Sequence, residues 1–210
     1  MKINQDRKQS FLYYVLDDIK INGWREDFFG SYTSEGVFTE NEIRVFFPKG
    51  RIDFLRYWFD LSDALMSDDL DEIEVLELKV RDRIKTIIKI RLERWKDFKV
   101  SIKKTLPILL MPSYTTHFTF SLMQTSNLIW KIAGDRSVDF NFYTKRGLLL
   151  GVYSTTLIYW LDDNSKNDQN TWEFLDRRIE EVLQVPKVKQ NIRFSINQLK
   201  NNISKTINIF

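Results

Sequence analysis

The chain has 210 residues, of which 43% are hydrophobic and 29% charged, and its formal net charge is +3. This length suits one domain with a real core, and so small a net charge does not by itself indicate nucleic-acid binding. No cysteine is present, which excludes disulfides, thiolate nucleophiles and cysteine-ligated metal sites. Few glycines and prolines, with apolar residues at helical spacing, predict an all-α protein.

The first sixty residues predict a series of short helices. We expect a helix over residues 10–21 with Ser10 as its cap, short helices over 25–31 and 39–46, and a fourth from residue 51 toward residue 64. This order resembles the N-terminal helix-turn-helix of TetR-type regulators. The segment from residue 22 to residue 50 carries five acids against three bases. Because phosphate neutralisation dominates DNA affinity, we expect a degenerate helix-turn-helix that does not bind nucleic acid.

Charge separates strongly in the middle of the chain. Residues 60–77 contain eight acids and no base, whereas residues 79–104 contain eleven bases and three acids. The second block predicts one long helix with a buried stripe and a basic outer face, stopped by Pro107 and Pro112. Two solvated helix faces explain this pattern, and an electrostatic contact with a partner or an anionic surface is the alternative.

Three further helices are predicted, over residues 116–133, from residue 137 or 139 to residue 161, and from a cap at Asn170 or Thr171 to Pro186. Small residues along the second helix permit close approach of another helix or a ligand. An apolar helix of this kind could line a lipid-sized cavity, although core packing explains the same stripe. The residues that we expect to bind lipid are Phe118, Leu122, Trp130, Leu149, Val152, Tyr153 and Trp160.

Residues that could carry catalysis are scarce. His117 is the only histidine of the chain, so zinc and di-iron sites lack ligands. No phosphate-binding glycine motif or serine nucleophile elbow occurs. We therefore expect no enzymatic activity, no metal and no cofactor.

The tail, residues 187–210, predicts an amphipathic helix. Its apolar residues recur every three or four positions, and its charged residues are all basic. This pattern is typical of a helix lying on an anionic membrane surface, and packing on its own domain or on a second subunit is the alternative. The expected membrane-binding residues are Lys187, Lys189, Ile192, Arg193, Ile196, Leu199, Lys200 and Ile203.

One long stretch carries a specific resemblance. The sequence "IWKIAGDRSVDFNFYTKRGLLLGVYSTT", followed by "WLDD" and "TWEFLDRRIEEV", closely resembles the TetR-like accessory proteins of ubiquinone biosynthesis, the Coq-nine family. The similarity is dense from about residue 128 to residue 182 and looser over "NGW" and "FFPKG" near the start.

The resemblance implies a homodimeric TetR-like fold that has lost DNA binding and holds an isoprenoid lipid or quinone precursor. It also implies attachment to a membrane and presentation of the precursor to the di-iron demethoxyubiquinone hydroxylase. By position, Asp139, Phe142 and Tyr143 match the family's hydroxylase-binding patch, and we add the neighbouring Arg146. Phe142 stands where the family usually has Trp.

We thus expect a degenerate helix-turn-helix region (1–60), a lipid-binding and dimerisation core (61–186) and a membrane-facing helix (187–210). The first residues of the chain have the pattern of neither a signal peptide nor a transit peptide. We therefore expect a bacterial protein in the cytoplasm, peripheral on the inner face of the inner membrane. A TetR-type transcriptional regulator with a hydrophobic effector pocket is the alternative function, and a scaffold with a filled core is a third.

Overall fold

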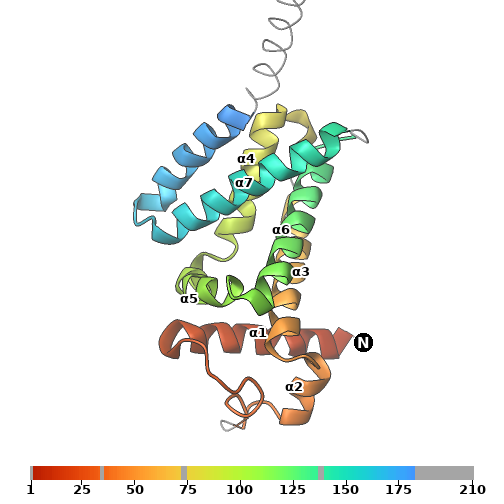
Figure 1. Cartoon of the computed structure of the whole chain (residues 1–210), viewed down its shortest axis with the longest axis vertical. Helices are drawn as coiled ribbons and strands as arrows, with labels where there is room; N and C mark the ends of the chain where they lie inside the picture. Colours follow the sequence, from red (N-terminus) through yellow and green to blue (C-terminus); the bar gives the residue numbers. More distant parts are fainter. Residues whose placement is uncertain (1, 34–35, 72–74, 137–139, 183–210) are drawn as a thin grey trace, which may run out of the picture.

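The computed structural model of the chain describes residues 2–33, 36–71, 75–136 and 140–182 (Figure 1). Within these ranges the regular elements are helices, without a strand, which confirms the expected all-α fold. In the same ranges, no helix combines the length and hydrophobicity needed to cross a bilayer. The tail expected to bind membranes lies outside the described residues.

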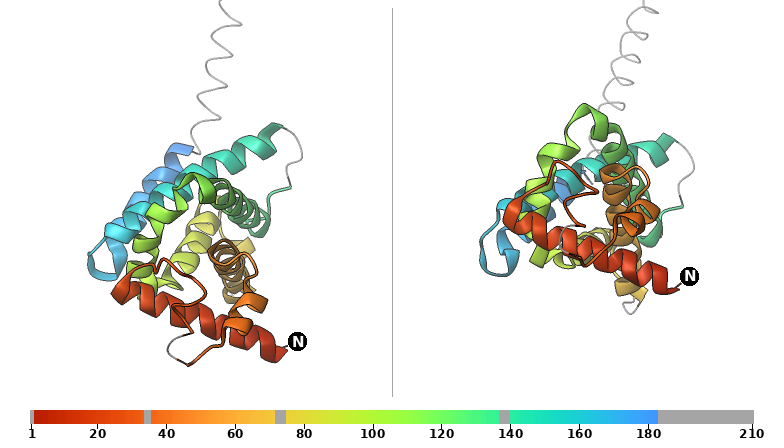
Figure 2. Two further views of the ribbon diagram at one scale, coloured as in Figure 1. Left: turned by 60° about the horizontal axis from the view of Figure 1, so that its bottom comes forward. Right: turned by 90° about the horizontal axis from the view of Figure 1, so that it is seen from below.

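The lower layer of the molecule contains α1 (Lys2–Asn22) and α2 (Glu40–Phe46). Seen from below, α1 crosses beneath the other helices (Figure 2) and contacts α5 (Lys99–Leu109). Ser10 lies inside α1 rather than at its start, and its hydroxyl donates to the Asp6 carbonyl at 2.9 Å. The helix therefore begins earlier than the sequence predicted.

The short helix predicted over residues 25–31 is not formed, because this segment makes successive turns. The Asp27 carboxylate accepts the backbone N–H of Phe29 at 3.0 Å, and such Asx turns compete with helix formation. The Tyr32 ring then packs edge-on against Phe11, with ring centroids 5.9 Å apart. By contrast, α2 forms as predicted, with Thr39 in a capping box.

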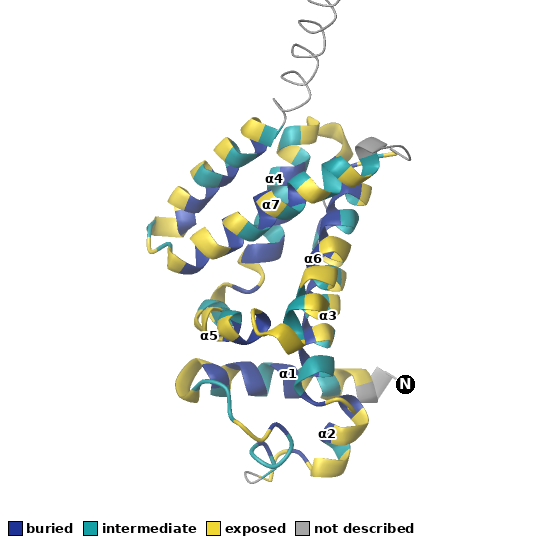
Figure 3. Cartoon of the chain, viewed as in Figure 1, coloured by how far each residue is buried: buried dark blue, intermediate teal, exposed yellow. Residues whose placement is uncertain are grey.

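A single helix, α3 (Arg51–Asp71), joins the lower layer to the upper one. It runs through residue 60 without a break, so the two regions that we expected to meet there share one helix. Buried positions recur along α3 (Figure 3). They include Phe54, whose ring packs against Phe11 of α1, and Met66. The division into regions stays a prediction.

The long basic helix predicted over residues 79–104 is wrong, because the chain forms two helices here. After a short 3-10 turn (Val75–Glu77), α4 (Val80–Glu93) is separated from α5 by a second 3-10 turn (Lys96–Phe98). The break turns Trp95 inward, where its ring packs edge-on against Trp58 with centroids 5.6 Å apart. Pro107 lies within α5 instead of ending it.

The upper layer is completed by α6 (Pro112–Ile132), α7 (Phe140–Asp162) and a helix over residues 169–182, which follows a 3-10 turn (Lys166–Asp168). The N–H of Gly134 donates to Lys131 and that of Asp135 to Trp130, a Schellman motif that ends α6 as predicted. Thr171 does not cap the last helix, because its own N–H donates to Asp163 at 2.8 Å. The Asp163 carboxylate and the Ser165 hydroxyl accept backbone N–H groups of the first turn of this helix instead.

Candidate functional site

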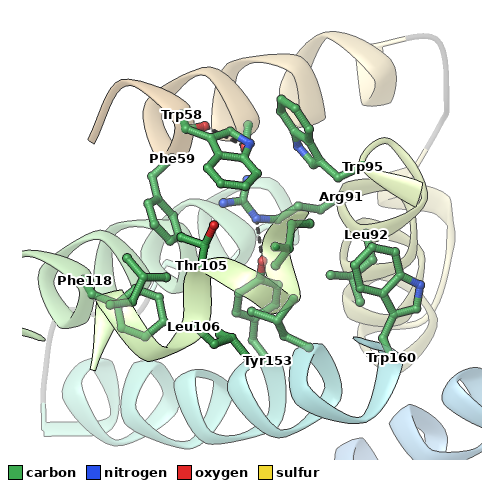
Figure 4. Close-up of a pocket in the computed structure, with 14 residues that line it drawn as sticks. Trp58, Phe59, Arg91, Leu92, Trp95, Thr105, Leu106, Phe118, Tyr153 and Trp160 are labelled. Carbon is green, nitrogen blue, oxygen red and sulfur yellow. Dashed lines mark hydrogen bonds between the residues drawn. The ribbon is translucent and has the colours of Figure 1, made fainter. Parts of the chain in front are cut away.

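An apolar pocket lies between α3, α4, α5, α6 and α7 (Figure 4). Its free volume is about 50 Å³, whereas a cavity of about 150 Å³ holds benzene. The pocket must therefore widen before it takes an organic ligand. Its wall consists of Trp58, Phe59, Ser62, Arg91, Leu92, Trp95, Ile102, Thr105, Leu106, Leu109, Phe118, Tyr153, Leu157 and Trp160.

A buried arginine crosses this wall. Arg91 is 3% exposed, and its Nε donates to the Tyr153 hydroxyl at 2.9 Å. Its Nη1 lies 2.6 Å from the Asp63 carboxylate, an ion pair without the geometry of a regular hydrogen bond. The Thr125 hydroxyl donates to the same carboxylate at 2.9 Å. The guanidinium charge is thus compensated within the chain.

The arrangement affects the titration of Asp63. Burial raises the pKa of the Asp63 carboxyl above its usual value, while Arg91 and the Thr125 hydroxyl act in the opposite direction. Buried pairs of this kind add little net stability, but removing one partner leaves an uncompensated charge. Together with the Arg91–Tyr153 hydrogen bond, the pair links α3, α4 and α7 at one side of the pocket.

Trp95 presents an unsatisfied donor at the same pocket. The residue is 5% exposed, and its Nε1 has no hydrogen-bond partner among the described residues. An unsatisfied buried donor costs about 1–3 kcal/mol. Its indole is held by Trp58 on one side and Tyr13 on the other. Trp95 is therefore a residue of the pocket wall whose buried N–H lacks a hydrogen-bond acceptor among the described residues.

Two aromatic rings lie between the pocket and a smaller neighbouring hollow. Phe59 of α3 and Phe118 of α6 pack with centroids 5.6 Å apart. Both also line a smaller outer hollow whose other walls include Tyr114 and the exposed His117. Displacement of these rings would connect the hollow to the pocket.

The predicted lipid-binding residues divide into two groups. Phe118, Tyr153 and Trp160 line the pocket. The others are buried in the core outside its wall: Leu122, Trp130, Leu149 and Val152. Sequence reasoning missed the walls contributed by α3, α4 and α5, including Trp58, Arg91 and Trp95. The spacing of apolar and aromatic residues indicated that these positions are buried. A single long helix over residues 79–104, as we expected, would not bring them together around one pocket.

The predicted partner patch is only partly a free surface. Tyr143 is 72% exposed beside the half-buried Phe142, with centroids 5.1 Å apart. Arg146 stacks over the Phe142 ring at 3.4 Å and donates to the Asn127 side chain at 2.8 Å and to Asp135 at 3.2 Å. Arg146 therefore supports the patch from within. Asp139 lies outside the described residues.

The surface of α2 keeps the acidic character expected from the sequence. Glu42 is a partly exposed carboxylate whose pKa is lowered to about 2, first by the hydrogen bond from Arg7 and then by Thr39. The only base of the helix, Arg44, pairs with Glu40 at 2.6 Å. Within the described residues, no cluster of three or more His, Cys, Asp or Glu is placed to hold a metal ion.

Comparisons with known proteins converge on one family. The family model described as COQ9 matches residues 115–186. A probable ubiquinone biosynthesis protein coq9 of Dictyostelium discoideum is 29% identical over 72% of this chain and 47% of its own length. The COQ9 protein of Rattus norvegicus is 31% identical over 54% of this chain and 35% of its length. The chain spans about half or less of these relatives, and their likeness confirms the resemblance carried by the sequence.

Two further comparisons extend beyond that segment. The coq9 protein of Schizosaccharomyces pombe is 24% identical over 89% of this chain and 74% of its own length. A TetR transcriptional regulator from Nitrosomonas europaea superposes with a TM-score of 0.70 and 18% identity, covering 85% of this chain and 98% of the regulator. The expected TetR-like fold is thus confirmed, and at this identity the likeness concerns the fold alone.

These relatives correct one expectation. All three COQ9 relatives are eukaryotic proteins described as mitochondrial. The location that we expected, in a bacterial cytoplasm on the inner face of the inner membrane, is therefore contradicted. The sequence argument failed because it relied on where the chain begins.

Proposed function

We propose that the chain acts in ubiquinone biosynthesis as a non-catalytic lipid-binding protein, because it is similar to the COQ9 ubiquinone biosynthesis proteins. It binds an isoprenoid quinone precursor and presents it to the demethoxyubiquinone hydroxylase at a membrane surface. The observation that carries the proposal is the aromatic-walled pocket enclosed by five helices in a chain that matches the COQ9 model over residues 115–186.

Native mass spectrometry after detergent-free purification tests the binding step. We expect a prenyl lipid to co-purify with the wild-type protein. The substitution Leu106→Phe, in the pocket wall, should exclude this lipid. Leu150→Phe is the matched control, since Leu150 packs on the core without lining the pocket. Protein that carries no prenyl lipid, even after incubation with one, would contradict the proposal.

The membrane step concerns the tail. Its basic amphipathic pattern supports reversible attachment, because each base near an anionic surface contributes roughly 1 kcal/mol. We expect the full chain to float with liposomes containing anionic lipid and the chain lacking residues 187–210 to remain in solution. Equal flotation of the two proteins would assign attachment to another surface.

We also propose that the chain is a homodimer through α7 and the helix over residues 169–182. Gly147 and Gly151 have no heavy atom within 4 Å of an added Cβ, so their face of α7 is open to a second helix. Ile158 is 55% exposed on the same helix. Sedimentation should show a dimer that Ile158→Asp dissociates, and a monomeric wild type would refute this contact.

Transcriptional regulation is the alternative function, and DNA binding distinguishes it from lipid presentation. The TetR-like fold favours it, while the acidic α2 opposes contact with phosphates. A gel-shift titration on genomic DNA fragments should show no binding below micromolar protein. A specific shift that a prenyl lipid reverses would favour transcriptional regulation.

A further inference from the structure

The pocket wall has an unsatisfied donor, while the hydroxyls of Ser62 and Thr105 already donate elsewhere. The buried Nε1–H of Trp95 has no acceptor among the described residues. The Ser62 hydroxyl donates to the Trp58 carbonyl at 2.7 Å, and the Thr105 hydroxyl donates to the Ser101 carbonyl at 2.7 Å. A ligand that satisfies Trp95 must therefore bring an acceptor oxygen.

The charge of the wall limits that ligand to a neutral group. The Arg91 guanidinium is compensated by the Asp63 carboxylate at 2.6 Å. An anionic ligand would have to take Arg91 from Asp63 and leave a buried carboxylate uncompensated. A cationic ligand would meet a carboxylate that is already paired. Both changes are unfavourable in a closed apolar site.

The aromatic rings of the pocket wall favour a planar ligand group. Aromatic rings reach the pocket from α3, from the α4–α5 junction, from α6 and from α7. Rings in such walls accept another ring by offset stacking or edge-to-face contact. Phe59 and Phe118 stand between this space and the outer hollow, so a chain attached to the ring would leave past them.

We propose that the pocket receives the ring end of its ligand, a neutral planar ring with acceptor oxygens, and that Trp95 Nε1 donates to one of those oxygens. This inference rests on the proposed lipid-binding function and deepens it. It makes Trp95 the residue that distinguishes an oxygenated ring from a plain hydrocarbon, and the Arg91–Asp63 pair the feature that excludes carboxylated rings.

Replacement of Trp95 by β-(3-benzothienyl)alanine tests the hydrogen bond, because sulfur replaces the N–H with almost no change of shape. The probes are a decyl-substituted 1,4-benzoquinone, decylbenzene and 4-decylbenzoate, titrated calorimetrically into the full chain from cyclodextrin. We expect wild-type protein to prefer the quinone and to bind the benzoate most weakly. The variant should lose about 5-fold in quinone affinity, with decylbenzene affinity unchanged.

The same replacement at Trp160 is the matched control, since Trp160 lines the pocket and its Nε1 already donates to the Asp168 carboxylate at 3.3 Å. It should leave quinone affinity unchanged. Unchanged quinone affinity in the Trp95 variant, or a preference of the wild type for the benzoate, would overturn the inference while leaving lipid binding intact. Wild-type protein that binds none of the probes would instead overturn the proposed function itself.

Discussion

The Nε of Arg91 donates to the hydroxyl of Tyr153 at 2.9 Å inside a pocket that is otherwise almost entirely apolar. The contact links α4 to α7, and Asp63 adds α3 through the ion pair. One buried cation thus contacts side chains of two other helices. The predictions begin with the energetic consequence of that arrangement.

Arg91→Met should destabilise the protein by about 3–5 kcal/mol, because it leaves the Asp63 carboxylate buried without its partner. Urea unfolding monitored by circular dichroism measures the change. The double variant Arg91→Met/Asp63→Asn should recover part of the loss, since no buried charge then remains. If the double variant loses the sum of the two single effects, the residues are not coupled.

Phe118→Ala should speed ligand uptake, because it removes one of the two rings that separate the pocket from the outer hollow. Stopped-flow binding of a prenyl probe measures the rate. Phe120→Ala on the same helix is the control, since Phe120 is 58% exposed and does not line the pocket. Equal uptake by both variants and the wild type would place the entrance elsewhere.

Asp163 should stabilise the fold at neutral pH and lose this effect in acid. Burial alone would raise its pKa, but hydrogen bonds from Thr171 and Ser165 prevail and lower the pKa of Asp163 from 3.8 to about 2. A carboxyl with a lowered pKa in the folded state contributes stability above its unfolded value, and this contribution disappears as pH falls from about 4 to about 2. The difference in unfolding free energy between wild type and Asp163→Asn should narrow over that window. A constant difference would contradict this assignment.

Tyr143→Ala should weaken capture of the hydroxylase without unfolding the protein, because Tyr143 is 72% exposed and such surface changes usually alter stability by less than about 0.5 kcal/mol. Pull-down with the purified hydroxylase measures capture, and melting temperature checks the fold. Tyr114→Ala, in the outer hollow on α6, is the control. Undiminished capture by Tyr143→Ala would remove this residue from the interface.

Local signals in the sequence predicted much of the helical framework. Gly134 ends α6 in a left-handed conformation, with φ +83, and Thr39 begins α2 with a capping box. Both features act within a few residues, so a single sequence contains them. The family resemblance likewise rests on one continuous stretch, and the COQ9 match over residues 115–186 confirms it.

The break between α4 and α5 was not predicted because its cause is tertiary. The helical spacing of apolar residues continues through Trp95, whereas in the structure its ring packs against the distant Trp58 and Tyr13 at the break. The Arg91–Asp63 pair was missed for the same reason, since its partners lie in the opposite charge blocks and were expected to face solvent. Long-range compensation of this kind is invisible to residue spacing.

The unbroken helix α3 connects the lower and the upper layer of the molecule. Phe54 packs in the lower aromatic cluster, and Trp58, one helical turn later, forms part of the pocket wall. Because one helix carries both residues, a ligand that displaces Trp58 acts on the same helix that carries Phe54. Phe54 also packs against Phe47 beside the acidic α2, so such a displacement would reach a surface poorly suited to contact DNA phosphates.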